Sequence, residues 1–217
     1  FNAGIPYRVY GGLRFFERAE IKHALAYLRL IENPHDDTSF LRVVNFPPRG
    51  IGARSVEQLQ DVARASGCSL HDAVSAVTGR AGTAIAGFVA KMDVLRERSV
   101  GASLKDIIEL VLEHSGLIEH YRQEREGQER VENLEELVNA AESFVMQEGF
   151  GRDATALTQS PVSQGLDPNA PVLDEPLAPD ADTGETMSPL AAFLTHAALE
   201  SGDNQAQAGQ DAVQLMT

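Results

Sequence analysis

The clearest chemical signal in the sequence is a glycine pair around one apolar residue, Gly50, Ile51 and Gly52, with Arg49 and Arg54 on either side. Glycine lets the backbone adopt positive φ and approach another surface closely. A helix that starts directly after such a turn exposes backbone N–H groups that can bind a phosphate oxygen. The segment predicts a helix-hairpin-helix motif that contacts a nucleic-acid backbone without reading the bases. Glycine pairs also occur in ordinary turns, so a plain turn with solvent-facing arginines is the alternative.

Motifs for catalysis or metal binding are missing from the sequence. It contains no GxxxxGK[ST] loop and no Gly-Lys dipeptide, so nothing in it would hold the phosphates of ATP. The six histidines show neither an HExxH pattern nor a spacing that pairs with Cys68. Adjacent acids such as Glu135 and Glu136 do not face each other on a helix, which favours a solvated face over a catalytic pair. We therefore expect no catalytic residue, metal site or cofactor within the chain itself.

Charge is distributed unevenly along the 217 residues. The net charge is −14, yet residues 1–64 carry nine Lys or Arg against seven Asp or Glu, whereas residues 150–217 carry one against ten. The acidic balance is thus concentrated in the C-terminal part, and nucleic acid remains a possible partner for the N-terminal part. No apolar run reaches the length of a membrane span, and no secretory signal is recognisable. We expect a cytoplasmic location and no membrane contact.

Apolar residues recur at helical spacing through most of the chain and predict a mainly α fold, a helical bundle. Longer helices are expected at about 17–31, 54–65, 83–97, 104–114 and 129–147. Shorter helices are expected after Asp36 or Asp37 and after Ser69, and a last one begins at Ser188-Pro189. Ser69 with Asp72, and Ser103 with Asp106, have the spacing of capping boxes.

The two ends of the chain look different from the bundle. Residues 5–10 and 212–217 alternate like short strands and are expected to join the sheet of an α/β domain that the chain does not contain. Residues 150–187 hold five of the ten prolines and predict a disordered acidic insertion. The expected organisation is therefore an α/β edge at 1–16, a helical domain at 17–149, the insertion at 150–187, a returning helix at 188–203, and a linker with a strand at 204–217.

Three segments in this order resemble UvrD/PcrA/Rep-like superfamily-one DNA helicases: YRVYGGLRFFERAEIKHALAYLRLI (7–31), VVNFPPRGIG (43–52) and RVENLEEL (130–137). The resemblance covers essentially residues 3–149 and 188–217. It implies that the chain is the helical accessory domain called 2B, flanked by strands of the RecA-like domain 2A. The whole helicase would use ATP and Mg²⁺ to unwind DNA in the 3′-to-5′ direction during repair or replication. The chain alone would be inactive, because it lacks the phosphate-binding loop.

The resemblance also implies roles for individual residues. The residues expected to touch the duplex are Arg49, Gly50, Ile51, Gly52 and Arg54. Those expected near the translocating single strand, or in a simple strand-to-helix turn, are Tyr10, Gly11, Gly12 and Arg14. Those expected to orient the domain on its neighbour, or to form a solvated face, are Arg130, Glu132, Asn133 and Glu135. His23 stands where relatives usually carry Asp, which is interpreted as a helix-surface substitution.

The expected partners are duplex DNA, the other domains of the same helicase and repair proteins, in a bacterial, nucleoid-associated setting. Two alternatives stay open. The first is an acidic helical module that binds other proteins of repair or replication, with residues 150–187 as a docking arm. The second is a subunit of a related helicase-nuclease. Salt dependence separates DNA binding from the first alternative, since phosphate contacts weaken steeply as salt rises.

Overall fold

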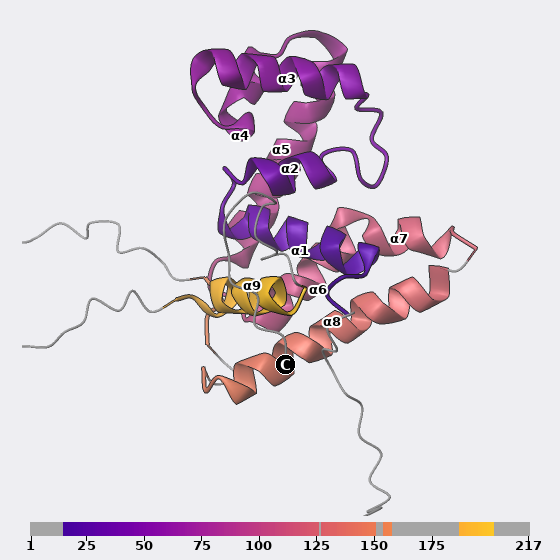
Figure 1. Cartoon of the computed structure of the whole chain (residues 1–217), viewed down its shortest axis with the longest axis vertical. Helices are drawn as coiled ribbons and strands as arrows, with labels where there is room; N and C mark the ends of the chain where they lie inside the picture. The colour runs from indigo at the N-terminus through magenta and orange to yellow at the C-terminus, as the bar shows by residue number, and fades with distance from the viewer. Residues whose placement is uncertain (1–14, 126, 151–153, 158–186, 202–217) are drawn as a thin grey trace, which may run out of the picture.

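The structure is a computed structural model, and it describes residues 15–125, 127–150, 154–157 and 187–201. The helices in these ranges are α1 (Ala19–Glu32), α2 (Asp37–Val43), α3 (Ala53–Ser66), α4 (Leu70–Ala73), the 3₁₀ turn η1 (Val74–Ala76), α5 (Gly79–Ser99), α6 (Leu104–Ser115), α7 (Leu117–Arg122), α8 (Gly127–Gln147) and α9 (Pro189–Glu200) (Figure 1). Within the described ranges there is no strand, only an isolated bridge between Ser103 and Thr155. The mainly helical fold is thus confirmed. The predicted terminal strands lie outside the described residues.

Helix α1 lies at the centre of this arrangement. It contacts α2, α5, α6, α8 and α9, and its residues between Ile21 and Ile31 are buried except for Lys22, His23 and Arg29, which are half-buried. Figure 1 shows α3 and α4 at one end of the molecule and α8 at the other, with the long α5 extending from the α3 end toward α6. The connection between α2 and α3, which contains the glycine pair, therefore lies away from α8.

Helix starts follow the capping patterns of the sequence. The Ser103 hydroxyl accepts a hydrogen bond from the Asp106 N–H at 3.2 Å, and the Asp106 carboxylate accepts one from the Ser103 N–H at 3.3 Å. These two bonds complete a capping box and satisfy N–H groups that the helix itself cannot pair. Ser69 caps α4, and Ser188, followed by Pro189 in the first turn, caps α9. The helix starts predicted at these serines are confirmed.

Gly116 both ends α6 and precedes α7 without an intervening loop. Its φ of 84° lies in the left-handed region that favours glycine. The change of direction lets α7 place Leu117 and Tyr121 in the core, at 0% and 1% exposed. Helix α7 was not among the sequence predictions, because six residues are too few to show a helical period. Gly116 is the signal that marks it.

Residues 154–157 correct the predicted start of the disordered insertion at residue 150. The Ala156 N–H donates to the Ala102 carbonyl at 2.9 Å, and the Ala156 carbonyl accepts from the Leu190 N–H at 3.0 Å. Ala156 is fully buried. These residues thus join the α5–α6 connection to the start of α9. Composition misses such a contact, because a small side chain and two backbone bonds leave little trace in a polar, proline-rich stretch. Residues 151–153 and 158–186 of the predicted insertion lie outside the described residues.

The positive φ of Gly116 leads to a prediction on stability, for which Gly87 is the matched control. Gly116→Ala should lower the free energy of unfolding by about 1–2 kcal/mol, since alanine is strained at this positive φ. Gly87→Ala should raise it by about 0.5–1 kcal/mol, because Gly87 lies inside α5 and an added methyl meets nothing within 4 Å. Urea denaturation followed by circular dichroism measures both values. Changes of the same sign in the two variants would contradict the assigned role of Gly116.

Candidate nucleic-acid interface

The two glycines of the α2–α3 connection differ in whether the backbone requires glycine there. Gly50 has a φ of 75°, which favours glycine. Gly52 is the N-cap of α3 and has a φ of −78°, which any residue adopts. A Cβ at either position would meet nothing within 4 Å. The fold therefore requires glycine at 50, whereas at 52 neither φ nor packing does. Both are exposed, so the backbone here is open to an approaching surface.

Ile51 and Asn45 hold this hairpin on the body of the domain. The Ile51 side chain is 1% exposed and belongs to the core. The Asn45 side-chain oxygen accepts hydrogen bonds from the backbone N–H groups of Arg49, at 2.9 Å, and Ile51, at 3.1 Å. Ile51 thus anchors the hairpin and does not present its side chain outward, contrary to the direct contact expected from the sequence. Asn45 was missed there, although asparagine commonly orders nearby backbone N–H groups in turns.

Arg49 points into the protein, which corrects its expected role as a phosphate ligand. Its Nη1 donates to the carbonyls of Val43 at 2.9 Å and Pro47 at 3.1 Å. Its Nη2 donates to the Ser115 carbonyl at 3.1 Å and to the Tyr27 hydroxyl. The guanidinium carbon also lies 5.2 Å from the centre of the Phe88 ring, within cation–π range. The planar donor fork of arginine matches these converging acceptors, so Arg49 positions the hairpin from behind.

Helix α3 starts directly after the hairpin and has no side-chain cap and no acidic residue in its first turn. The first N–H groups of a helix have no partner within it and carry partial positive charge. Arg54 lies exposed in this first turn, and no hydrogen bond or ion pair joins it to another described residue. Backbone N–H groups and a guanidinium are therefore exposed together at the start of α3, while the expected duplex contact of Gly52 and Arg54 stays a prediction.

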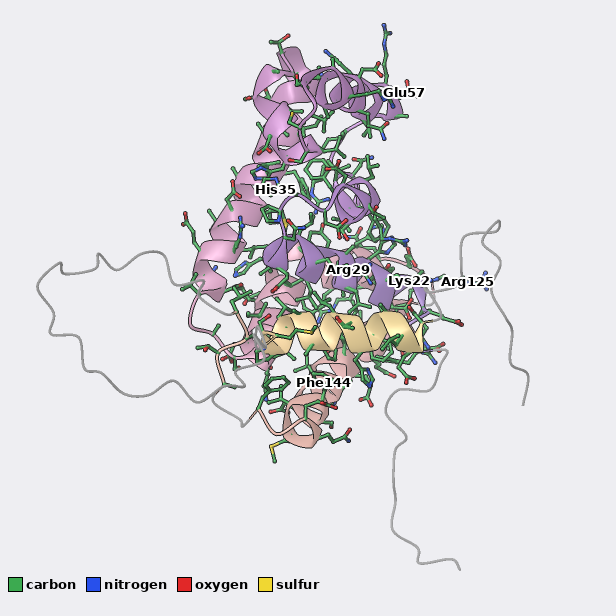
Figure 2. All side chains as sticks on the ribbon, turned by 60° about the vertical axis from the view of Figure 1, so that its left-hand side comes forward. Lys22, Arg29, His35, Glu57, Arg125 and Phe144 are labelled. Carbon is green, nitrogen blue, oxygen red and sulfur yellow. The ribbon has the colours of Figure 1, made fainter. Side chains whose placement is uncertain are left out.

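A basic groove between α1 and α2 was not identified from the sequence. Its cavity of about 270 Å³ is lined by Lys22, Arg29 and Arg42, together with Leu25, Ala26, Thr38 and Ser39. Figure 2 labels Lys22 and Arg29 on α1. No acidic side chain lines this groove, although the chain carries a net charge of −14. The available signal was the seven-residue spacing of Lys22 and Arg29, which places both on one face of a helix.

The segment 130–137 contributes bonds between α8 and α1. Arg130 Nη1 lies 3.1 Å from a Glu20 carboxylate oxygen, and the Asn133 side-chain amide donates to the other oxygen at 2.8 Å. Only 5% of the Glu20 side chain is exposed. Glu132 instead accepts a bond from Gln128 on the same exposed helix face. Arg130 and Asn133 therefore have a packing role within the domain, while the expected role in orienting a neighbouring domain stays a prediction.

Comparison with known proteins places the chain in a family. The whole chain, residues 1–217, matches the model of the UvrD-like helicase C-terminal domain. The chain belongs to this family. It is 40% identical to DNA helicase II of Haemophilus influenzae over 221 residues and 40% identical to DNA helicase II of Escherichia coli over 224 residues. It is 36% identical to the ATP-dependent DNA helicase PcrA of Bacillus subtilis over 150 residues.

The UvrD-like chain is much shorter than these relatives. The matches cover 98%, 100% and 66% of the chain but 26%, 26% and 20% of the respective relatives. None of the described helices combines the length and apolar character needed to cross a membrane. The residues expected near single-stranded DNA, Tyr10, Gly11, Gly12 and Arg14, lie outside the described residues.

His23 of this UvrD-like domain is a packing residue, which corrects its interpretation as a surface substitution. Its ring stacks on Phe46 with 3.8 Å between ring centroids, and its Nδ1 lies 2.8 Å from the Tyr121 hydroxyl. Burial, together with the nearby Arg42 charge, lowers the pKa of His23 to about 4. The neutral ring thus joins α1 to Phe46 at the base of the hairpin and to α7.

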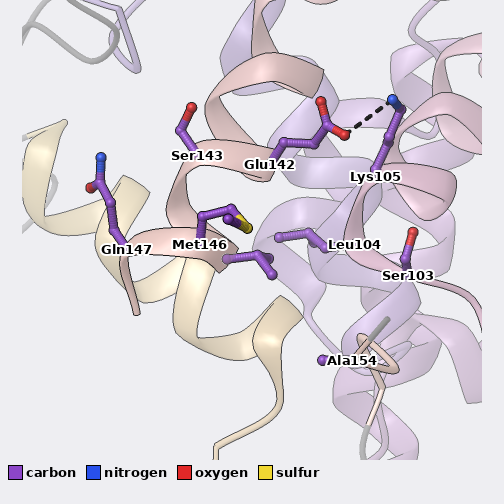
Figure 3. A pocket seen from close by; sticks show the side chains of 9 residues that line it. Ser103, Leu104, Lys105, Glu142, Ser143, Met146, Gln147 and Ala154 are labelled. Carbon is purple, nitrogen blue, oxygen red and sulfur yellow. Dashed lines mark hydrogen bonds and ion pairs between the residues drawn. The ribbon is translucent and has the colours of Figure 1, made fainter. Parts of the chain in front are cut away.

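A separate hollow of about 490 Å³ between α6 and α8 contributes little chemistry (Figure 3). Its two charged lining residues, Lys105 and Glu142, form an ion pair at 3.2 Å. Its other lining residues are apolar or uncharged, and Met146 is largely exposed. We assign no function to this hollow, because its charges already neutralise each other.

The inward position of Arg49 predicts a contrast in stability between two arginines. Arg49→Lys should lower the free energy of unfolding by about 2–3 kcal/mol, because lysine cannot satisfy all the carbonyl acceptors that Arg49 reaches. Arg54→Lys should change it by less than about 0.5 kcal/mol, as is usual for exposed positions. Urea denaturation measures both. Equal effects would show that the Arg49 contacts do not hold the hairpin.

The lowered pKa of His23 predicts a loss of stability in mild acid. The unfolded histidine takes up a proton near its ordinary pKa of 6.5, whereas the folded one does so only near 4. The contribution of His23 is therefore complete above pH 6.5 and is lost as the pH falls from 6.5 toward 4. His23→Phe keeps an aromatic ring and removes this titration. Its free energy of unfolding should fall less steeply over that pH range than that of the unchanged chain; identical slopes would refute the assignment.

Proposed function

We propose that this chain is a helical accessory domain, of the 2B type, of an ATP-dependent DNA helicase that unwinds in the 3′-to-5′ direction in DNA repair or replication. Its own part is to hold the duplex backbone and to regulate unwinding. The observation that carries this proposal is the exposed Gly50–Gly52 backbone leading into the uncapped start of α3. ATP and Mg²⁺ would be bound elsewhere in the helicase, since the chain has no phosphate-binding loop.

The open space around the Gly52 backbone supports the proposed duplex contact. A phosphate oxygen can reach N–H groups at a helix start only where no side chain stands in the way. Gly52 leaves that space open, and no internal contact explains the missing side chain. The anchoring of Ile51 in the core keeps this backbone fixed before DNA arrives, which reduces the ordering cost of binding.

The charge distribution supports a contact that does not depend on base sequence. Arg54 adds a cation beside the hairpin, and the groove with Lys22, Arg29 and Arg42 adds a second basic surface on the preceding helices. Glu57, one turn after Arg54, is exposed on the same helix (Figure 2). Arg64, near the other end of α3, already pairs with Asp61. The positive charge available to a duplex thus lies in the first turn of α3, so the duplex would be held at the helix start and not along the helix. Arginine and lysine contacts to phosphates position DNA and weaken with salt.

The regulatory part of the proposal concerns motion of the whole domain. A rigid hairpin transmits a force on the duplex only if the bundle behind it moves as one body. The Glu20, Arg130 and Asn133 contacts between α1 and α8 support such rigidity. We infer that the domain swings about its two connections to the neighbouring α/β domain. The residues that would contact the single strand near these connections are Tyr10, Gly11, Gly12 and Arg14. A cytoplasmic setting with other repair proteins as partners belongs to the same proposal.

A second candidate function is binding of a basic protein partner. A groove of about 640 Å³ between α6, α7 and α8 has an acidic rim over apolar residues that include Leu112, Ile118 and Val138. Four glutamates line it, Glu109, Glu113, Glu119 and Glu135, against two cations, Lys105 and Arg122, so its lining is acidic by two charges. This net charge is of the wrong sign for DNA and complements lysine or arginine side chains. This candidate uses a different face and is compatible with duplex binding by the hairpin.

The duplex contact predicts that two exposed substitutions weaken DNA binding without unfolding the protein. Fluorescence anisotropy is measured with a duplex carrying a single-stranded tail, at a series of salt concentrations. Gly52→Ala should lower affinity several-fold, because a methyl group blocks the approach of phosphate. Arg54→Ala should reduce the slope of log affinity against log salt by about 1, as expected for one lost phosphate contact.

Matched controls keep this test specific. Gly87→Ala adds a methyl on α5, and Arg64→Ala removes an exposed arginine at the other end of α3 that already pairs with Asp61. Both should bind DNA like the unchanged chain. Stability of Gly52→Ala is measured in parallel, since its N-cap and chain-entropy effects oppose each other at about 0.5–1 kcal/mol each. Unchanged DNA affinity in folded Gly52→Ala and Arg54→Ala would reject the hairpin contact and leave the protein-binding candidate.

A further inference from the structure

Two histidines that are distant in the sequence meet an aspartate beside α4. His35 lies in the connection between α1 and α2, whereas His71 and Asp72 belong to α4. Each side chain offers one potential ligand atom, and these three atoms lie within 4.8 Å of one another. His35 and Asp72 are about half exposed and His71 is 25% exposed, so an ion could enter from solvent. Figure 2 labels His35 at this position.

The ring nitrogens already face the carboxylate. His71 Nδ1 lies 3.3 Å from one Asp72 oxygen, and His35 Nδ1 lies 3.5 Å from the other. Ligands about 2.0–2.1 Å from a tetrahedral zinc ion lie about 3.3–3.4 Å from each other. His71 Nδ1 is thus at ligand spacing from one Asp72 oxygen, and His35 Nδ1 is close to that spacing from the other oxygen. All three potential ligand atoms lie within 4.8 Å of one another. A small rotation of the exposed His35 side chain would bring its nitrogen to ligand spacing from the other two atoms.

A further carboxylate supports the orientation of His71. If Nδ1 of His71 binds the ion, its Nε2 carries the proton, and this atom lies 3.4 Å from an Asp93 oxygen on α5. Metal-bound histidines typically donate their second N–H to a carboxylate in this way, which fixes the ring and strengthens the ligand. Asp93 is thus a positioning residue and not a ligand.

The same groups have weaker partners without an ion. His35 Nδ1 lies 2.8 Å from the Ser69 hydroxyl, which also donates to Asp72. An ion would replace the bond between His35 and Ser69 with a stronger interaction and leave the Ser69 cap on α4 in place. Imidazole and carboxylate together suit divalent transition metals of the zinc class, and three protein ligands leave a fourth position for water.

We propose that His35, His71 and Asp72 form a binding site for Zn²⁺ or a chemically similar divalent transition metal. The ion would join the α1–α2 connection to α4, and through Asp93 to α5. The three elements belong to the end of the molecule that carries the hairpin (Figure 1). The site is independent of the proposed DNA contact, because none of its residues belongs to the hairpin or to the basic groove. It also departs from the sequence-based expectation of no metal site.

Calorimetric titration of the tag-free 217-residue chain with Zn²⁺ tests this site. One ion should bind per chain, and His35→Ala and His71→Ala should each lower the affinity at least about tenfold. Asp93→Asn should lower it about 10- to 100-fold, the range found for supporting carboxylates. His114→Ala is the matched control, since His114 also has a neighbouring carboxylate, Glu113 at 3.8 Å, but belongs to no such cluster.

Two further readouts separate a built site from loose association. Co²⁺ in place of Zn²⁺ should give the visible absorption of a site with nitrogen and oxygen ligands, and the spectrum should persist in Cys68→Ser, because the thiol is not a ligand. Zn²⁺ should raise the melting temperature of the unchanged chain and of His114→Ala, but not of His35→Ala or His71→Ala. Absence of one-to-one binding to the unchanged chain, or equal affinity in the two histidine variants with circular dichroism unchanged, would overturn the proposal.

Discussion

The hydrogen bonds of the half-buried Arg49 guanidinium are the interaction on which the geometry of the hairpin depends. It joins the end of α2, the end of α6 and Tyr27 of α1, with the Phe88 ring of α5 beside it. Tyr27 in turn donates to the Phe46 carbonyl at 2.6 Å. Four helices therefore converge on one side chain that has only neutral acceptors. The cost of partly desolvating its charge is offset by several charge-assisted hydrogen bonds made at once, which ties the hairpin position to the packing of the whole bundle.

A second polar cluster lies near the start of α1, two turns before Tyr27. The Glu20 carboxylate is nearly buried and is bound by Arg130 and Asn133 of α8. Buried ion pairs of this kind often add little net stability, because desolvation cancels much of the attraction. Their effect is on specificity, since any other register of α8 along α1 would leave the carboxylate without partners. The two clusters thus set the position of α1 at two points along its length, while apolar contacts supply most of the stability.

The sequence predicted the local features of this fold better than its long-range ones. Helix starts at Ser69, Ser103 and Ser188 were predictable, because capping depends on residues three positions apart. Arg49 and His23 were misjudged, since their roles depend on Tyr27, Ser115 and Tyr121, which are distant along the chain. The cluster of His35 and His71 was missed for the same reason. Whether a polar residue near a turn faces outward or inward is decided by packing that periodicity does not encode.

The hairpin glycines also differ in what maintains them. Gly50 is required by its own backbone angle, so any lineage that keeps this fold must keep a glycine there or accept strain. Gly52 has an ordinary angle and open space around it, so folding alone is nearly indifferent to alanine at this position. Two glycines separated by one residue are thus under different selective pressures: the fold itself at Gly50, and binding to another molecule at Gly52. A comparison of how freely the two positions drift would separate the history of the fold from that of its recognition surface.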